Sequence, residues 1–168
     1  MLENSGSILP FTEIALRLVA AIVLGGALGL DRELKQKPAG IRTNALVALG
    51  ASAIVVMSLE CPVSGRSYNA NALTRVIQGI LTGIGFLGAG VIMRVDRQQK
   101  VHGLTTAASI WIVACLGIAC GAGRWRVALL SFGMALAILV FGERLEHNIH
   151  RWFGISAAQR YKSGTSEE

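Results

Sequence analysis

The sequence predicts an all-α, polytopic integral membrane protein with five transmembrane helices. Five stretches are almost entirely apolar, and each has the roughly 17–20 residues that a helix needs to cross about 30 Å of hydrocarbon. Backbone N–H and C=O groups in lipid must pair within their own segment, so each stretch is expected to be helical. The stretches are residues 11–30, 43–59, 75–93, 104–122 and 126–142.

Composition supports the same class. The mean hydropathy is +0.53, and charged residues make up 15% of the chain, against about 25% in soluble domains. The stretches are apolar on all faces, whereas the helices of a soluble bundle would carry one apolar stripe. The net charge of +6 is spread between the stretches rather than gathered in one block. This pattern indicates a lipid bilayer as partner and not nucleic acid.

The distribution of Lys and Arg predicts the orientation. Segments 31–42, 94–103 and 143–168 hold 11 of the 16 basic residues, whereas segments 1–10, 60–75 and 123–126 hold four. The positive-inside rule therefore places the amino terminus outside and the carboxyl terminus in the cytoplasm. Residues 1–10 lack the basic region of a signal peptide, so the first span is expected to stay as an anchor. We expect a transmembrane domain over 1–142 and a short cytoplasmic amphipathic tail over 143–168.

Glycines recur in the spans at spacings that favour helix packing. Because lipid gives helices no hydrophobic reason to associate, small residues that allow close backbone approach supply the contact. The third span holds five glycines, more than one packing seam needs, and a break or a close approach to a ligand near 85–90 is the alternative interpretation. The predicted packing positions are Gly25, Gly29, Gly79, Gly83, Gly85, Gly88, Gly90, Gly117 and Gly121.

Polar residues gather where the first span ends and the second begins. Pro38 and Gly40 predict a turn that brings the two span ends together. A charge at the hydrocarbon boundary is costly unless it is paired or functional; an ordinary solvated loop is the plainer interpretation. We therefore predict a functional polar cluster, in which a carboxylate pairs with Arg32 or Arg42. Its residues on these segments are Asp31, Arg32, Glu33, Arg42, Thr43 and Asn44.

The start of the fourth span is the second part of this cluster. Thr105, Thr106 and Ser109 either return hydrogen bonds to the preceding helical turn or present hydroxyls at a helix amino terminus, which favours an anion. The charge count puts this helix start on the same membrane face as segment 31–44. We therefore expect the two segments to lie close together.

The remaining polar residues predict no chemistry. Arg17 is expected to reach the headgroups, with Glu13 one turn away as its partner. Arg75 and Gln78 open the third span and would line any outer vestibule. In the tail, Glu143, Glu146, His147 and His150 have metal-compatible spacing, but a solvated face is the better interpretation. Cys61, Cys115 and Cys120 form neither a disulfide framework nor a zinc site. We predict no catalytic residue, metal site or cofactor, and no enzyme.

Three long motifs carry a resemblance to a known family. They are GLDRELKQKPAGIRTNALVALG (29–50), GIGFLGAGVIM (83–93) and VHGLTTAASIWIVACLGIACGAG (101–123). In this order they resemble the MgtC/SapB family of bacterial inner-membrane proteins. The positions that match the family pattern are Arg32, Ala39, Gly40, Arg42, Thr43, Gly83, Gly85, Phe86, Gly88, Gly90, Gly103, Leu104, Thr105 and Ala107.

The resemblance implies a multi-pass protein of the bacterial inner membrane, with a periplasmic amino terminus and a cytoplasmic carboxyl terminus. Many members continue into a cytoplasmic ACT-type domain; this sequence is expected to be a short form without it. Many members also carry a Gln where Gly79 stands here, next to Gln78, so a shared polar role at that position is not expected to carry over.

Two functions remain open at this stage. One is a regulator of membrane transport, or of ATP synthase and membrane potential, linked to magnesium or acid stress and acting on another membrane transporter or ATP synthase. The other is an oligomeric transporter or channel for Mg²⁺ or another cation. A homo-oligomer, most simply a dimer, is expected as a partner. For the transporter, a dimer would double the five spans, which are few for a pore.

Overall fold

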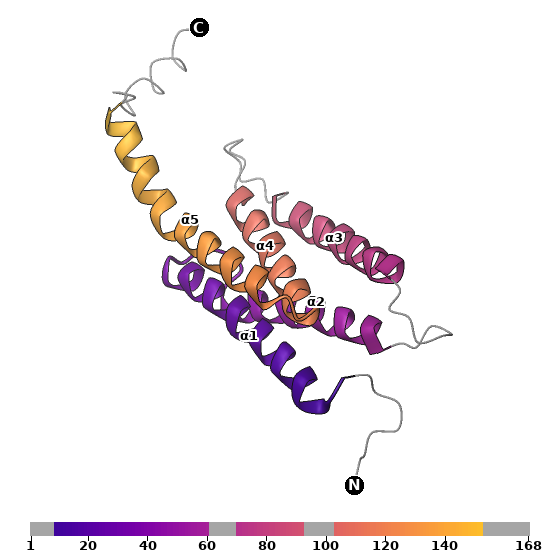
Figure 1. The fold of residues 1–168 in the computed structure, drawn as a ribbon. Coiled ribbons are helices and arrows are strands. Elements are labelled where there is room, and N and C mark those ends of the chain that lie inside the picture. Colours follow the sequence, from indigo (N-terminus) through magenta and orange to yellow (C-terminus); the bar gives the residue numbers. More distant parts are fainter. Residues whose placement is uncertain (1–8, 61–69, 93–102, 153–168) are drawn as a thin grey trace, which may run out of the picture. The chain divides into compact units, whose positions relative to one another are not determined.

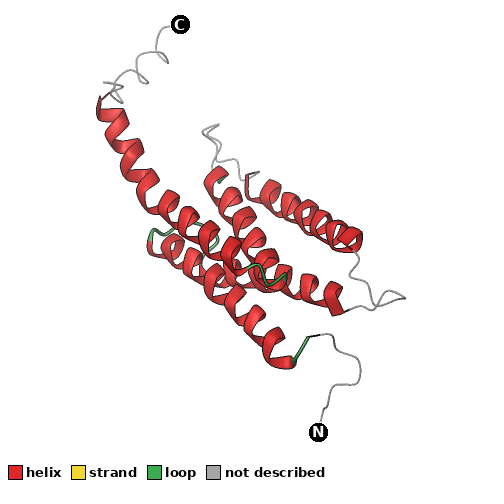
Figure 2. Ribbon diagram, viewed as in Figure 1, coloured by secondary structure: helices red, strands yellow, loops and turns green. Residues whose placement is uncertain are grey.

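The computed structural model describes residues 9–60, 70–92 and 103–152, except for the side chains of 143–152 and Ala70. The regular secondary structure in this part of the chain is all helix, with short turns between some of the helices (Figure 2). Its five helices are α1 (Phe11–Leu34), α2 (Ile41–Glu60), α3 (Ala70–Ile92), α4 (Leu104–Gly121) and α5 (Trp125–Trp152). All five are long and apolar enough to cross a membrane, which confirms the predicted fold class.

The chain divides into two compact units, Met1–Gly133 and Met134–Glu168. The boundary lies inside α5, which continues as one helix from Trp125 through the expected domain boundary at residue 142. Within the described residues, the second unit is therefore the carboxyl-terminal part of a helix. The side chains of the predicted tail face are outside the part that the structure describes; they belong to Glu143, Glu146, His147 and His150. Cys61 also lies outside the described residues.

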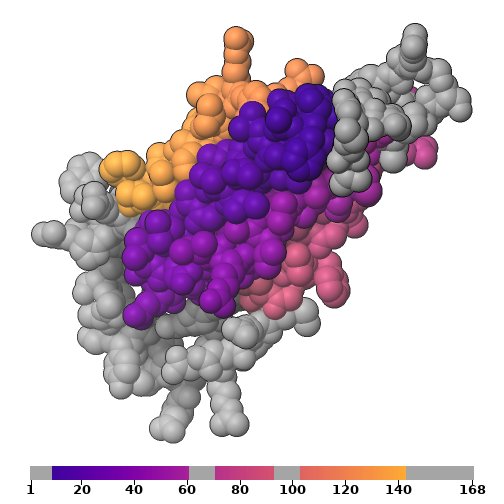
Figure 3. Space-filling view, turned by 90° about the horizontal axis from the view of Figure 1, so that it is seen from below, coloured from indigo at the N-terminus to yellow at the C-terminus, as the bar shows by residue number. Residues whose placement is uncertain are grey.

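In the first unit, α1 to α4 pack as a bundle (Figure 1). Helix α1 lies alongside α2, as Figure 3 shows from below with α1 in indigo and α2 in purple. Helix α4 contacts α1, α2 and α3, so it is the central element. Its buried residues include Ile110, Val113, Ala114 and Leu116, all at most 3% exposed. Helix α4 is apolar on every side because three other helices pack against most of its surface.

Glycine spacing sets how closely these helices approach. A Cβ atom on Gly25 would lie 2.7 Å from the Ala48 Cβ of α2, and one on Gly29 would lie 2.7 Å from the Gly40 carbonyl oxygen. In α4, a Cβ on Gly117 would overlap the carbonyl oxygen of Ala48, and one on Gly121 would lie 2.7 Å from that of Ser52. Both α1 and α4 therefore lie directly against the backbone of α2 at these positions.

The third helix is different. It is continuous over Ala70–Ile92, without a break near 85–90. Gly88 is buried, and a Cβ there would make an ordinary 3.6 Å contact with the Ala107 Cβ of α4. Apart from the neighbouring backbone of α3 itself, no atom of the described chain lies within 4 Å of a Cβ on Gly79, Gly83, Gly85 or Gly90. These four glycines have no packing partner among the described residues.

Candidate functional site: a buried arginine at the helix ends

The carboxyl end of α1 carries Arg32, whose side chain is only 2% exposed. Its Nη2 donates a hydrogen bond to the Thr106 hydroxyl of α4. Its Nε donates to the Pro38 carbonyl oxygen at 3.2 Å. One guanidinium therefore joins the end of α1, the turn between α1 and α2, and the start of α4, which confirms that these three segments meet at one end of the bundle.

The turn over residues 35–40 wraps this guanidinium with its backbone. Lys37 N–H donates to the Arg32 carbonyl oxygen at 2.9 Å, and Gln36 and Ala39 adopt positive φ values of 52° and 60°. Positive φ is uncommon for residues with a Cβ and carries a modest strain. The strained geometry directs successive carbonyl groups of the turn to side chains of α1 and α2.

Asn44 of α2 is fully buried beneath this turn. Its Nδ2 donates to the carbonyl oxygens of Ala39 at 2.5 Å and Gly40 at 3.0 Å. Its Oδ1 has no hydrogen-bond partner among the described residues. A buried amide oxygen without a partner is unusual, since most buried polar atoms are paired.

The two carboxylates bind locally instead of pairing with an arginine. Asp31 Oδ1 lies 3.0 Å from Lys35 Nζ, one turn along α1. Glu33 Oε2 accepts a hydrogen bond from the Ile41 N–H at 2.9 Å and so caps the start of α2. We expected a carboxylate to pair with Arg32 or Arg42; the structure differs, because a carbonyl and a hydroxyl hold Arg32 and no ion pair of Arg42 is found in the described part of the chain.

The predicted cluster is thus divided by burial. Arg32, Asn44, Thr106 and Ser109 are buried, and the Ser109 hydroxyl donates to the Thr106 carbonyl oxygen at 2.8 Å. The exposed members are Glu33, Arg42, Thr43 and Thr105, while Asp31 is half-buried. Sequence reasoning placed Thr105 and Thr106 together, and only Thr106 reaches Arg32. It missed the carbonyl groups of Pro38, Ala39 and Gly40, which no side-chain pattern signals.

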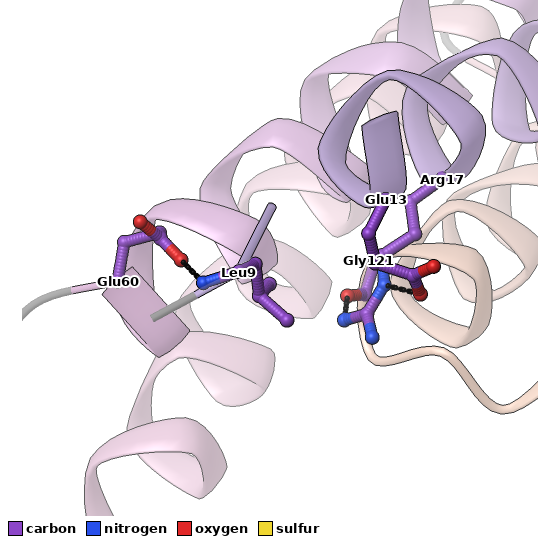
Figure 4. A network of polar contacts seen from close by, with 5 residues as sticks. All are labelled: Leu9, Glu13, Arg17, Glu60 and Gly121. Carbon is purple, nitrogen blue, oxygen red and sulfur yellow. Dashed lines mark hydrogen bonds and ion pairs between the residues drawn. The ribbon is translucent and has the colours of Figure 1, made fainter. Parts of the chain in front are cut away.

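A second polar cluster lies at the opposite ends of the same helices (Figure 4). Arg17 Nε lies 2.8 Å from Glu13 Oε1, the pairing expected from their spacing. Arg17 Nη1 also donates to the Gly121 carbonyl oxygen at 2.8 Å, at the end of α4. Just before α1, the Leu9 N–H donates a hydrogen bond to Glu60 Oε1 at 2.8 Å, which connects the start of α1 with the end of α2. Arg17 therefore binds a helix terminus within the bundle.

The end of α4 is shaped to receive Arg17. Gly123 has a φ of 67°, Gly123 N–H donates to Cys120 O, and Arg124 N–H donates to Ala119 O, the pattern of a Schellman motif. A Cβ on Gly123 would also lie 2.8 Å from Arg17 Nη2. Glycine is needed here both for the left-handed backbone and for space. A cation at a helix carboxyl terminus is also favoured by the helix dipole.

Comparison with known proteins gives the family. The model of the MgtC family matches residues 18–148. Protein SrpB of Synechococcus elongatus is 38% identical over 79% of this chain and 76% of its own length. Proteins named MgtC are 46% identical over 77% of this chain in Brucella abortus and 43% identical over 69% in Salmonella typhimurium.

The match covers 51% of the Brucella protein and 46% of the Salmonella protein, so the chain spans about half the length of these two relatives. No solved structure matches the chain. The family model nevertheless includes all three motifs noted in the sequence and every buried residue of the Arg32 cluster. This chain belongs to the MgtC family.

Proposed function

We propose that this protein is an inner-membrane regulator that acts on a membrane transporter or on ATP synthase, and so on membrane potential, by helix–helix contact in the bilayer. The conditions proposed for this role are magnesium limitation or acid stress. Family membership supports an MgtC-like membrane protein. The regulatory role is supported by an open groove on the surface of the first unit.

The groove lies between α2 and α3 and has a volume of about 690 Å³. It is lined by apolar side chains such as Leu46, Ile54 and Leu87, and by glycines of both helices. Apart from the neighbouring backbone of their own helices, no atom of the described chain lies within 4 Å of a Cβ on Gly50, Gly79 or Gly83. Exposed backbone of this kind allows a partner helix to approach closely, which is how small residues stabilise contacts between membrane helices.

The test uses inverted inner-membrane vesicles from cells that express the full chain. ATP-driven proton pumping is followed by quenching of an acridine dye, and the resulting potential by an oxonol dye. We expect the wild-type chain to lower the pumping rate at least twofold relative to vesicles without it. Gly83→Leu should restore the rate, because the new side chain fills the groove.

Gly133→Leu is the matched control. Gly133 is exposed on α5, and a Cβ there would meet no described atom within 4 Å beyond the neighbouring backbone of its own helix, so the same substitution should leave the effect intact. Membrane content of each variant is measured by immunoblot. Equal pumping with and without the wild-type chain would contradict action on ATP synthase, and equal effects of the two Leu variants would contradict the groove as contact site.

A cation transporter is the second candidate, and one observation favours it. Helix α2 buries two polar oxygens that have no hydrogen-bond partner among the described residues, Asn44 Oδ1 and Ser52 Oγ. They lie eight residues apart on one helix, about 12 Å along its axis. Such oxygens are suitable for coordinating a passing cation.

Flux into liposomes distinguishes the two candidates. Purified protein is reconstituted with a Mg²⁺-sensitive dye inside, and a Mg²⁺ gradient is applied with a permeant counter-ion present. The regulatory proposal predicts no uptake above protein-free liposomes. Uptake that falls in Ser52→Ala would overturn it in favour of transport.

A further inference from the structure

The groove between α2 and α3 begins beside an arginine. Arg75 directly precedes Val76, the first residue of α3 that lines the groove. It also lies one and two turns before Gly79 and Gly83, so the three positions follow one ridge of α3. From Val76 to Leu87 the groove follows α3 over about 16 Å. Half of a hydrocarbon layer of about 30 Å is about 15 Å, so the groove has the depth of one leaflet.

The guanidinium of Arg75 is free to bind an anion. Its side chain is exposed, and it makes no hydrogen bond or ion pair within the described residues. Helix α3 itself contains no acidic residue. The carboxylates described at this end of α1 and α2 are already bonded, Glu13 to Arg17 and Glu60 to the Leu9 N–H (Figure 4). A second copy of the chain in the same orientation would therefore offer no free described carboxylate at this level.

The groove itself suits an acyl chain. Its volume of about 690 Å³ is lined by apolar side chains such as Leu46, Ile54 and Leu87. Beyond the neighbouring helix backbone, nothing in the described chain lies within 4 Å of a Cβ on Gly79 or Gly83. A thin, flexible chain of methylene groups can lie directly against this exposed backbone. Since lipid provides no hydrophobic drive, such van der Waals contact is what holds apolar groups together in the membrane.

We propose that the groove binds one anionic phospholipid, with its phosphate on Arg75 and an acyl chain along Gly79 and Gly83. A guanidinium binds a phosphate through two parallel hydrogen bonds. The side chain of a helical residue tilts toward the helix amino terminus, which at Arg75 is the direction of the headgroups. A net negative headgroup is preferred to a zwitterionic one, because no described carboxylate at this end is free to receive an ammonium group.

The opposite end of the groove is less suitable for a phosphate. Arg42 lies one turn before Leu46, the first residue of α2 that lines the groove. The carboxylate of Glu33 is bound there, since its Oε2 accepts a hydrogen bond from the Ile41 N–H at 2.9 Å. A negative charge next to Arg42 repels a second anion. The charges therefore assign the headgroup to the Arg75 end.

The lipid lies on the surface proposed for a partner helix, so the partner would have to displace it. In that respect alone the inference rests on the proposed function, since lipid binding needs no partner protein. A chain that binds the lipid without affecting proton pumping would refute only the regulatory role. A chain that affects pumping without selective lipid binding would refute only this inference.

The experiment measures lipid binding to the purified full chain by native mass spectrometry. The protein in detergent receives equal amounts of phosphatidylglycerol and phosphatidylethanolamine with the same acyl chains. We expect one phosphatidylglycerol per chain, retained at least fivefold more than phosphatidylethanolamine. Arg75→Gln should lower this retention at least fivefold, while Arg75→Lys, which keeps a cation, should lower it less. Gly79→Leu should lower the retention of both lipids, because its side chain fills the groove.

Two matched controls carry the same substitutions elsewhere. Arg126→Gln changes an exposed arginine at the start of α5, and Gly133→Leu changes an exposed glycine of the same helix. Both should retain phosphatidylglycerol as the wild type does. Circular dichroism shows that each variant is folded. Glycerol phosphate, which has the anion without an acyl chain, should not compete at equal concentration.

Three outcomes would overturn the inference. Equal retention of the two lipids, unchanged in Arg75→Gln, would mean that only the general lipid surround is bound. Loss in Arg42→Gln but not in Arg75→Gln would place the headgroup at the other end of the groove. A lipid-free dimer that is lost in Gly79→Leu would show that a second copy covers the groove.

Discussion

Arg32 of α1 and Thr106 of α4 are joined by a buried hydrogen bond, although 74 residues separate them in the sequence. At the other end of the same two helices, Arg17 binds the carbonyl oxygen of Gly121. Arg17 and Arg32 are 15 residues apart, and so are Thr106 and Gly121. The two contacts therefore define one antiparallel register between α1 and α4, held by an arginine of α1 at each end.

Loss of the Thr106 hydroxyl should destabilise the bundle. Thr106→Val leaves a guanidinium N–H of Arg32 buried without an acceptor, and an unpaired buried group of this kind costs about 1–3 kcal/mol. Thr106→Ser keeps the hydroxyl and should be close to wild type. The unfolding midpoints of the variants are compared by heating each protein in detergent and measuring the remaining folded fraction by size-exclusion chromatography.

Thr105→Val is the matched control, since Thr105 is exposed one residue away. We expect its midpoint to stay near that of the wild type. Equal losses for the Thr105 and Thr106 variants would show that the Arg32–Thr106 bond does not stabilise the fold.

Neighbouring glycines of α1 should differ sharply in their tolerance of alanine. In Gly29→Ala the new methyl group would lie 2.7 Å from both the Gly40 oxygen and the Ile41 Cα, so backbone must move. In Gly26→Ala the nearest atom is Ile41 Cγ2 at 3.7 Å, an ordinary contact. Overpacking of this kind costs about 1–3 kcal/mol, so only Gly29→Ala should lower the unfolding midpoint.

The Gly26 variant serves as the control for helix propensity, because it introduces the same residue in the same helix. A Gly29→Ala chain as stable as the Gly26→Ala chain would mean that α1 and α2 lie further apart than described.

Arg17 should stabilise the folded bundle through its bonds to other residues, and not merely carry a charge to the headgroups. Arg17→Gln removes the bond to the Gly121 carbonyl oxygen and the pairing with Glu13. We expect a loss of about 1–3 kcal/mol, seen as a lower unfolding midpoint. Arg126→Gln, an exposed arginine at the start of α5, should have little effect. An Arg17 that merely reached the headgroups would behave like Arg126.

Arg42 permits a separate test of function. Its side chain is exposed, so Arg42→Ala should insert and unfold as the wild type does. We predict that it loses the effect on ATP-driven proton pumping, since the exposed guanidinium makes no ion pair within the described residues and is available to a partner protein. Full activity of this variant would make Arg42 a topology signal alone.

The orientation can be checked with fusions after Gly142. The excess of Lys and Arg on one side predicts that a cytoplasmic fluorescent reporter is active there. A periplasmic alkaline phosphatase fused at the same residue should be inactive. Phosphatase activity at this position would reverse the orientation and place the Arg32 cluster at the outer face.

Sequence reasoning predicted the helices well because the spans are set by length and hydropathy. The differences lie at the ends. Helix α1 runs on to Leu34, and α3 begins at Ala70 rather than near Arg75, since polar residues there continue the helix beyond the apolar window. An apolar window marks the hydrocarbon, not the last helical turn.

The candidate site was predicted in outline only. The turn and the charge count predicted that segment 31–44 and the start of α4 lie close together. They did not predict which side chains of these segments are buried. Thr105 and Thr106 are equally polar, and in a helix that is apolar all round no stripe shows which one faces inward. Asp31 pairs with Lys35 because four-residue spacing on α1 offers a nearer cation than Arg42. Backbone acceptors such as the Pro38 carbonyl depend on turn geometry, which side-chain types do not reveal.

The shared register of α1 and α4 has a consequence for the response to the bilayer. The two arginine contacts are about 22 Å apart along the helices, and sliding one helix past the other would break both at once. If the bilayer is thicker or thinner than the hydrophobic length of α1 and α4, the two helices cannot adapt by sliding past each other. The pair must instead tilt as one body or deform the surrounding lipid, so membrane thickness acts on the orientation of the whole bundle.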